Sequence, residues 1–136
     1  MSDLAPHRGM PLTDLHIDNS HVADLSPLKG MPLKVLNFSD TKVRSLEPLK
    51  GMPLIILWCN NTEIADLSPV KGMLLEWITI QGTKINDLSP LKGMPLTQIY
   101  LGFKPDRDAE FLRAIRTLEK INDKPAAEFL KEVEQK

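Results

Sequence analysis

A Gly-Met pair recurs every 21 residues through most of this chain of 136 residues. The glycines of the five pairs are Gly9, Gly30, Gly51, Gly72 and Gly93. Prolines keep the same step at Pro6, Pro27, Pro48, Pro69 and Pro90, and leucines at Leu4, Leu25, Leu46, Leu67 and Leu88. A fixed period of this length is typical of a solenoid, in which each repeat buries its apolar face only against its neighbours. The period therefore constrains the fold much more than the function.

The first half of each repeat has the pattern of a short β-strand. In the repeat from Leu33 to Pro53, apolar and polar residues alternate between Leu36 and Phe38, as in a strand with one buried face. The equivalent apolar pairs are Leu15 and Ile17, Leu57 and Cys59, Ile78 and Ile80, and Ile99 and Leu101. Stacked about 4.8 Å apart, these strands would form one continuous core, in which Cys59 is expected to be an inert buried thiol.

The second half of each repeat has the signals of one helical or 3₁₀ turn. In the repeat that contains Gly30, Ser26 is a candidate N-cap, and Pro27 suits the first helical position, where its missing N–H costs nothing. Gly30 can take the left-handed conformation that ends such a turn. The other repeats carry Ser68-Pro69, Ser89-Pro90, Glu47-Pro48 and Ala5-Pro6 at the same place.

These positions together resemble the leucine-rich repeat family, whose pattern is LxxLxLxxNxL, over residues 4 to 104. The Ser-Pro-Leu-Lys-Gly half is most similar to bacterial repeats of the internalin type, shortened by one residue. The resemblance implies an α/β solenoid with parallel strands on the concave face and short turns or 3₁₀ helices on the convex side. At the place of the family's asparagine stand Ser20, Thr41, Thr62 and Thr83. Each hydroxyl can donate and accept one hydrogen bond at the bend.

Beyond Phe103 the period stops, and we predict a two-helix C-terminal cap. Asp106 is a candidate N-cap for a helix running to about Lys120, followed by a break at 122–125 and a second helix over about 125–135. The apolar residues of the two helices are Phe111, Leu112, Ile115, Leu118 and Ile121, then Phe129, Leu130 and Val133. We expect them to cover the last repeat, which divides the chain into a solenoid (1–104) and a cap (105–136); partner recognition by the helix pair is the alternative.

Apolar and aromatic residues occupy sheet positions that should face solvent. They are Val35, Ile56, Trp58, Trp77 and Tyr100. Exposed apolar patches commonly mark interaction sites, and tryptophan and tyrosine are frequent hot-spot residues. We therefore predict a partner-binding concave face on which Trp77 is largely exposed. The alternatives are that the cap folds over Tyr100 and Phe103, or that these aromatic residues have no binding role.

At the other end, no capping helix precedes Leu4, so the first repeat is predicted to be an open edge. A homodimer could shield its apolar residues, which are Leu4, Leu12, Leu15 and Leu25. The alternatives are that the chain is cut from a longer array, or that His7, Arg8 and His16 shield the edge well enough.

Two sets of charged residues are candidate sites for ions. Arg8, Lys29, Lys50, Lys71 and Lys92 form a basic ladder, opposed by Asp3, Asp24, Asp66 and Asp87. A phosphate polymer could bind the ladder, but a solvated edge that was duplicated with the repeat is the simpler reading. Asp14, His16 and Asp18 alternate on one side of the first strand and could hold zinc or manganese, although a polar rim is the preferred interpretation.

Composition narrows the function classes. The net charge of −1 argues against a nucleic-acid binder, and the single cysteine excludes an intramolecular disulfide. No apolar stretch approaches the ~20 residues that a membrane helix needs, and no signal peptide is seen, so the cytoplasm is the default compartment. With no nucleophile–base pair and no cofactor motif, we predict a non-catalytic module that binds a protein or peptide.

The alternative function is an assembly segment of a larger bacterial signalling protein that self-associates through its first repeat. It rests partly on the C-terminal segment, which resembles the ends of repeat arrays attached to bacterial serine/threonine kinases.

Overall fold

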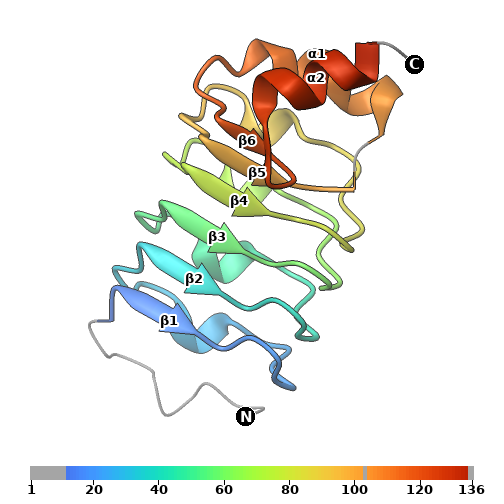
Figure 1. The fold of residues 1–136 in the computed structure, drawn as a ribbon. Helices are drawn as coiled ribbons and strands as arrows, with labels where there is room; N and C mark the ends of the chain where they lie inside the picture. The colour runs from blue at the N-terminus through green and yellow to red at the C-terminus, as the bar shows by residue number, and fades with distance from the viewer. Residues whose placement is uncertain (1–11, 103, 135–136) are drawn as a thin grey trace.

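The structure, a computed structural model, describes residues 12–102 and 104–134. Its core is a coil of rungs, each made of one strand and one 3₁₀ helix (Figure 1). The first five strands are β1 (Asp14–His16), β2 (Val35–Asn37), β3 (Ile56–Trp58), β4 (Trp77–Thr79) and β5 (Gln98–Tyr100). Each strand pairs in parallel with the next in chain order, so that Leu36 lies beside Leu57 and Leu57 beside Ile78. The predicted α/β solenoid is confirmed.

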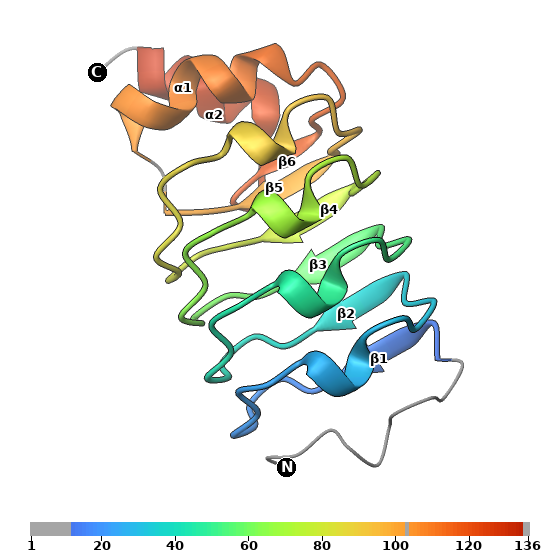
Figure 2. The same cartoon turned by 180° about the vertical axis from the view of Figure 1, so that it is seen from behind.

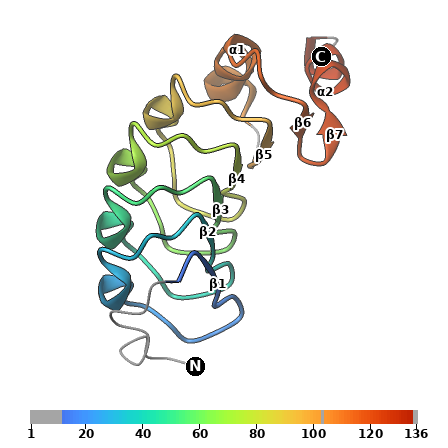
Figure 3. The same cartoon turned by 90° about the vertical axis from the view of Figure 1, so that its left-hand side faces the viewer.

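Four 3₁₀ helices form the other side of the coil (Figure 2). They are η2 (Ser26–Leu28), η3 (Glu47–Leu49), η4 (Ser68–Val70) and η5 (Ser89–Leu91). Seen from the side, the strands follow the inner line of the curve and the 3₁₀ helices the outer line (Figure 3). The solenoid therefore has its sheet on the concave face, as the family pattern implies.

The caps of η2, η4 and η5 differ from the prediction. Ser26 does not cap η2 with its side chain; instead, its N–H and its hydroxyl both donate to the carboxylate of Asp24, each at 2.9 Å. An aspartate two residues earlier in the chain can accept both bonds at once, one on each carboxylate oxygen. Asp66 does the same for Ser68, and Asp87 accepts from the N–H of Ser89 at 2.9 Å.

The rungs bury one continuous column of side chains. Leu36, Leu57, Ile78 and Ile99 are all fully buried at the centres of successive strands. At the bend after each strand, the hydroxyl that replaces the family's asparagine donates to the carbonyl three residues earlier. These bonds are Ser20 to Ile17, Thr41 to Phe38, Thr62 to Cys59 and Thr83 to Ile80. The bend is thus satisfied by short local bonds.

The C-terminal segment contains two helices, as predicted, but the first is shorter and a strand follows it. Its elements are α1 (Pro105–Ala114), β6 (Lys120–Ile121), β7 (Lys124–Pro125) and α2 (Ala126–Glu134). The prediction that the first helix runs to Lys120 is therefore wrong. Lys120 and Ile121 instead pair in parallel with Gln98 and Ile99 of β5, and Ile121 is fully buried. Joining the sheet lets the amide of Lys120 donate to Thr97 and buries Ile121, which a longer helix would not do.

A tight hairpin forms the C-terminal end of the sheet. Asn122 and Asp123 have φ angles of 51° and 69°, as a two-residue hairpin turn requires, and β7 runs antiparallel to β6. From β7 the chain enters α2, which contacts β6, β7 and α1. Figure 3 shows α1 continuing the outer row of 3₁₀ helices and β6 continuing the inner row of strands. The division of the chain at residue 104 into solenoid and cap stays a prediction.

At the first rung, Leu12 is half-buried, while Leu15 and Ile17 are buried. Leu4, His7 and Arg8 lie outside the described residues, as does Phe103. Among the residues that the structure describes, no helix is long and apolar enough to span a membrane.

Candidate binding face on the concave sheet

The strands place alternate side chains on opposite sides of the sheet. In β2, β3 and β5 the central residue is buried and the two flanking residues are half-buried. The parallel register then builds two columns on the open side. One column is Val35, Ile56, Trp77 and Gln98, and the other is Asn37, Trp58, Thr79 and Tyr100. All five residues predicted to bind a partner therefore lie on one face.

Trp58 and Trp77 form the centre of this face. Their rings meet edge to face, with centroids 4.9 Å apart and planes at 69°. The ring of His16 lies edge-on to Trp58, at 6.2 Å. Both tryptophans are half-buried, so the expectation that Trp77 is largely exposed is wrong. Its neighbour Trp58 covers part of the ring, a contact across rungs that the column pattern alone does not reveal.

Neither indole N–H of the pair has a hydrogen-bond partner among the described residues, although both Nε1 atoms are buried. A buried donor without an acceptor costs about 1–3 kcal/mol, so ring packing has to offset this cost. The polar edge of each ring is turned into the protein. The ring surface that stays exposed to a partner is therefore apolar.

Tyr100 is tied to the hairpin turn. Its hydroxyl donates to Asp123 Oδ1 at 2.9 Å. Partial burial, and then this bond to a carboxylate, raise the pKa of Tyr100 above its ordinary value. The contact on Tyr100 thus comes from the turn between β6 and β7, and it fixes the ring at the C-terminal end of the face.

A polar ladder borders the aromatic columns where the strands end. Asn60 links its neighbours in both directions: its N–H donates to Ser39 Oγ at 3.1 Å, and its Oδ1 accepts from the N–H of Gln81 at 2.8 Å. The side chain of Asn61 donates to Asp40 at 3.0 Å. The face therefore has an apolar centre and a polar border, the anatomy of many protein interfaces.

The two candidate ion sites differ in the structure. Within the described residues, Asp14, His16 and Asp18 do not form a group that could hold a metal ion. Lys29, Lys50, Lys71 and Lys92 are exposed and make no ion pair with any described residue. Their counterparts Asp66 and Asp87 cap 3₁₀ helices, and the bonds from Ser89 hold the pKa of Asp87 below its usual value. Arg8 and Asp3 lie outside the described residues.

Cys59 lies behind the face, in the core. It is fully buried, and burial raises the pKa of its thiol to about 12. Its Sγ donates to the carbonyl of Thr79 at 3.3 Å. The thiol is thus protonated at neutral pH, as expected for an inert core residue.

Comparison with known proteins gives similarity in structure alone. No protein-family model and no curated protein sequence matches the chain. An internalin (inlF) from Listeria monocytogenes is similar with a TM-score of 0.75 and 24% identity, over 88% of this chain and 37% of that one. Internalin C2 (inlC2) from the same organism has a TM-score of 0.57 and 21% identity, over 80% and 60%. The chain spans less than two thirds of either structure, and its fold is the internalin-like leucine-rich repeat solenoid.

Proposed function

We propose that this internalin-like solenoid is a non-catalytic binding module that holds a protein or peptide on its concave face. The contact residues would be Val35, Ile56, Trp58, Trp77 and Tyr100. The internalin-like fold supports binding in general, because a solenoid of this kind offers an extended curved surface.

The single observation that carries the proposal is the tryptophan pair. Trp58 and Trp77 pack edge to face on the solvent side of the sheet, although the core behind them is already filled by Leu57 and Ile78. Burying both indole N–H groups without a partner is unfavourable, so folding alone gives little reason to place two tryptophans here. A partner that covers their ring surface would use the kind of residue that most often dominates binding energy.

Tryptophan fluorescence can be used to test this proposal. It has two tryptophans, and both lie on the concave face, so tryptophan emission reports on this face alone. Peptides selected from a random display library on the wild-type protein would be titrated while the emission is followed. We expect binders that shift the emission and lose about tenfold or more in affinity in Trp58→Ala.

Arg44→Ala is the matched control, because Arg44 is exposed and lies outside the two columns. The proposal fails if binders are indifferent to Trp58→Ala and to Ile56→Asp, with circular dichroism showing that both variants are folded.

A second candidate is self-association through β1, as in an assembly segment of a larger bacterial signalling protein. Thr13 O accepts from β2 and Ile17 N donates to it, so the N–H groups of Asp14 and His16 point away from β2. Among the described residues, β1 has no strand on that side. Another copy could add a strand there.

Asp14→Pro removes one outward N–H and leaves the bonds to β2 in place, while Asp14→Ala is its control. Sedimentation over a range of concentrations should show a dimer in the wild type and the alanine variant, and a monomer in the proline variant. A wild-type monomer at every concentration would remove this candidate.

A further inference from the structure

We propose a second interaction surface, on the flank formed by the Gly-Met turns that lead from each 3₁₀ helix to the next strand. We call it the turn flank and define it by residues 51–55, 72–74 and 92–95, with 114–117 beside them. We infer that it binds an extended peptide segment of a partner that carries apolar and acidic side chains. None of these residues belongs to the two columns of the concave face, although Ile55 directly precedes Ile56.

The first observation is that Leu74 departs from the repeat pattern. It stands where the other repeats have proline, namely Pro11, Pro32, Pro53 and Pro95. Its side chain is 69% exposed, the one large hydrophobic residue so exposed in the described part of the chain. The described turns at Pro32, Pro53 and Pro95 hold proline at this position, so the repeat itself gives no reason for an exposed leucine here.

A groove lies beside Leu74. It has a volume of about 440 Å³ and is walled by apolar residues of two neighbouring rungs, among them Met52, Ile55 and Met73. Lys34 and Lys71 also line it, and none of its described lining residues is acidic. Neither lysine makes an ion pair with any residue in the described part of the chain. The groove is thus apolar at its walls and cationic at its rim.

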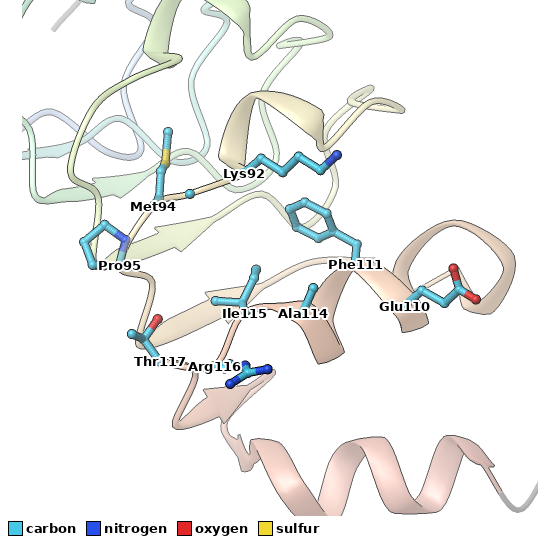
Figure 4. Close-up of a pocket in the computed structure, with 10 residues that line it drawn as sticks. Lys92, Met94, Pro95, Glu110, Phe111, Ala114, Ile115, Arg116 and Thr117 are labelled. Atoms are coloured by element: carbon cyan, nitrogen blue, oxygen red, sulfur yellow. The ribbon is translucent and has the colours of Figure 1, made fainter.

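A second groove, of about 660 Å³, lies further along the same flank. Figure 4 shows Phe111 and Ile115 of the α1 segment directed toward the turn that carries Lys92 and Met94. The charged residues that line this groove are two cations, Lys92 and Arg116, and one carboxylate, Glu110. It therefore repeats the chemistry of the first groove with a larger apolar wall.

The spacing of the grooves indicates an extended occupant. The first groove lies between the turns at Met52 and Met73, and the second between the turn at Met94 and the segment at Arg116. They are two rungs apart, about 10 Å at the strand spacing. In the extended polyproline II conformation, three residues cover about 9 Å and every third side chain points to the same side, so apolar side chains three positions apart would reach both grooves.

The charge of the two grooves indicates which residues the partner peptide carries between its apolar side chains. The grooves together present four cationic side chains, Lys34, Lys71, Lys92 and Arg116, and one carboxylate. Aspartate or glutamate in the partner would complement them and steer the encounter. A polyanion without apolar groups would leave Leu74 and the groove walls uncovered, so a peptide with both kinds of side chain fits better.

The test uses the full chain and a display library of random peptides of about twelve residues, a length that spans both grooves. Peptides that bind wild type are counter-selected on Leu74→Pro, which takes the residue of the other rungs. Enriched peptides are then labelled with fluorescein and titrated by anisotropy. We expect sequences with acidic residues between apolar residues three positions apart, and affinity about tenfold lower in Leu74→Pro and in Lys71→Glu.

Lys50→Glu is the matched control, because it makes the same charge change on the same ladder but Lys50 lines neither groove. The peptides should bind Lys50→Glu and Trp58→Ala like wild type and leave tryptophan emission unchanged, which separates this test from that of the concave face. The proposal is overturned if no peptide depends on Leu74, if the enriched peptides are basic, or if Lys50→Glu weakens binding as much as Lys71→Glu. Leu74-dependent binding of phosphatidylserine vesicles without any Leu74-dependent peptide would also overturn it, in favour of a lipid surface.

Discussion

The five inner rungs, β1 to β5, and the last rung, β6, build the same geometry from different residues. Between β1 and β5 each strand repeats after 21 residues, so that Asp14 pairs with Val35 and Trp77 with Gln98. The last rung keeps the strand, since Lys120 pairs with Gln98, but the step is 22 residues and the ten-residue helix α1 replaces the 3₁₀ helix. The structural repeat therefore continues for one rung after the sequence repeat has ended.

The comparison shows what a rung needs. An apolar residue in the central column and backbone bonds to the previous strand are present in both regions: Ile121 is fully buried, like Leu57. The sequence of the last rung has no Gly-Met pair, and η3 has Ser45 where the other 3₁₀ helices have the capping aspartate, so these features are one way of making the return and not a requirement of the sheet. The hairpin from β6 to β7 then supplies an antiparallel edge that the inner rungs do not have.

Removing the last rung should have the largest effect on folding. Deleting residues 106–136 removes β6, α1 and α2, which cover Ile99 and the other buried side chains of the fifth rung. Because an uncovered apolar rung of a solenoid is insoluble, we expect a protein that aggregates or unfolds. Size-exclusion chromatography and thermal unfolding measure this. A monomeric truncated protein with a cooperative transition would show that the inner rungs need no cover.

Truncating the central column should cost about the same in both regions. Leu57→Ala and Ile121→Ala should each lower the free energy of unfolding by about 2–5 kcal/mol, because both side chains are fully buried. Urea denaturation gives both values. A negligible loss for Ile121→Ala beside a full loss for Leu57→Ala would mean that the last rung is a loose lid and not part of the core.

The hairpin turn should show an intermediate effect. Asn122 Oδ1 accepts from the N–H of Leu101 at 2.8 Å, and its φ of 51° suits glycine or asparagine. Asn122→Gly keeps the backbone relaxed and removes the acceptor, so it should cost about 1–3 kcal/mol. Asn122→Ala adds backbone strain and should cost more. Equal stability of the glycine variant and the wild type would show that the bond to Leu101 contributes nothing.

The smallest effect concerns the link from the hairpin to the concave face. Tyr100 is the chain's single tyrosine, so its titration can be followed by absorbance without ambiguity. Burial and the bond to Asp123 favour the neutral phenol, so its pKa in the folded protein should lie above the ordinary value. Asp123→Asn should lower that pKa, whereas Lys124→Ala should not. The same pKa in Asp123→Asn and wild type would show that the turn does not hold Tyr100 in solution.

The inner rungs could be predicted because one motif recurs five times, so that a residue that departs from it in one copy does not hide the pattern. The positive φ of Gly30, the strand at Leu36 and the buried column all follow from residues that recur. The sequence does not reveal the aspartate cap, because Ser26 and Asp24 both recur with the period and the period does not indicate which one supplies the acceptor.

The last rung was harder, because it occurs once. Ile115, Leu118 and Ile121 fit a helical spacing, and nothing local marks the end of α1 at Ala114. The Asn-Asp pair before Lys124 was the available signal, because asparagine and aspartate favour the positive φ of a two-residue hairpin. On the concave face, the register placed Trp58 and Trp77 correctly, but their mutual packing depends on side-chain rotamers that no column pattern specifies.

Native-state amide exchange is the most direct test of the claim that the solenoid continues into a sixth strand. The amides of Lys120 and Asn122 donate to Thr97 and Ile99 at 3.0 and 2.9 Å, as the amide of Ile56 donates to Lys34 at 3.0 Å. If the last rung is part of the same cooperative sheet, protection at Lys120 and Asn122 should lie within about tenfold of that at Ile56. Exchange at these two amides as fast as in an exposed turn, with Ile56 still protected, would contradict it.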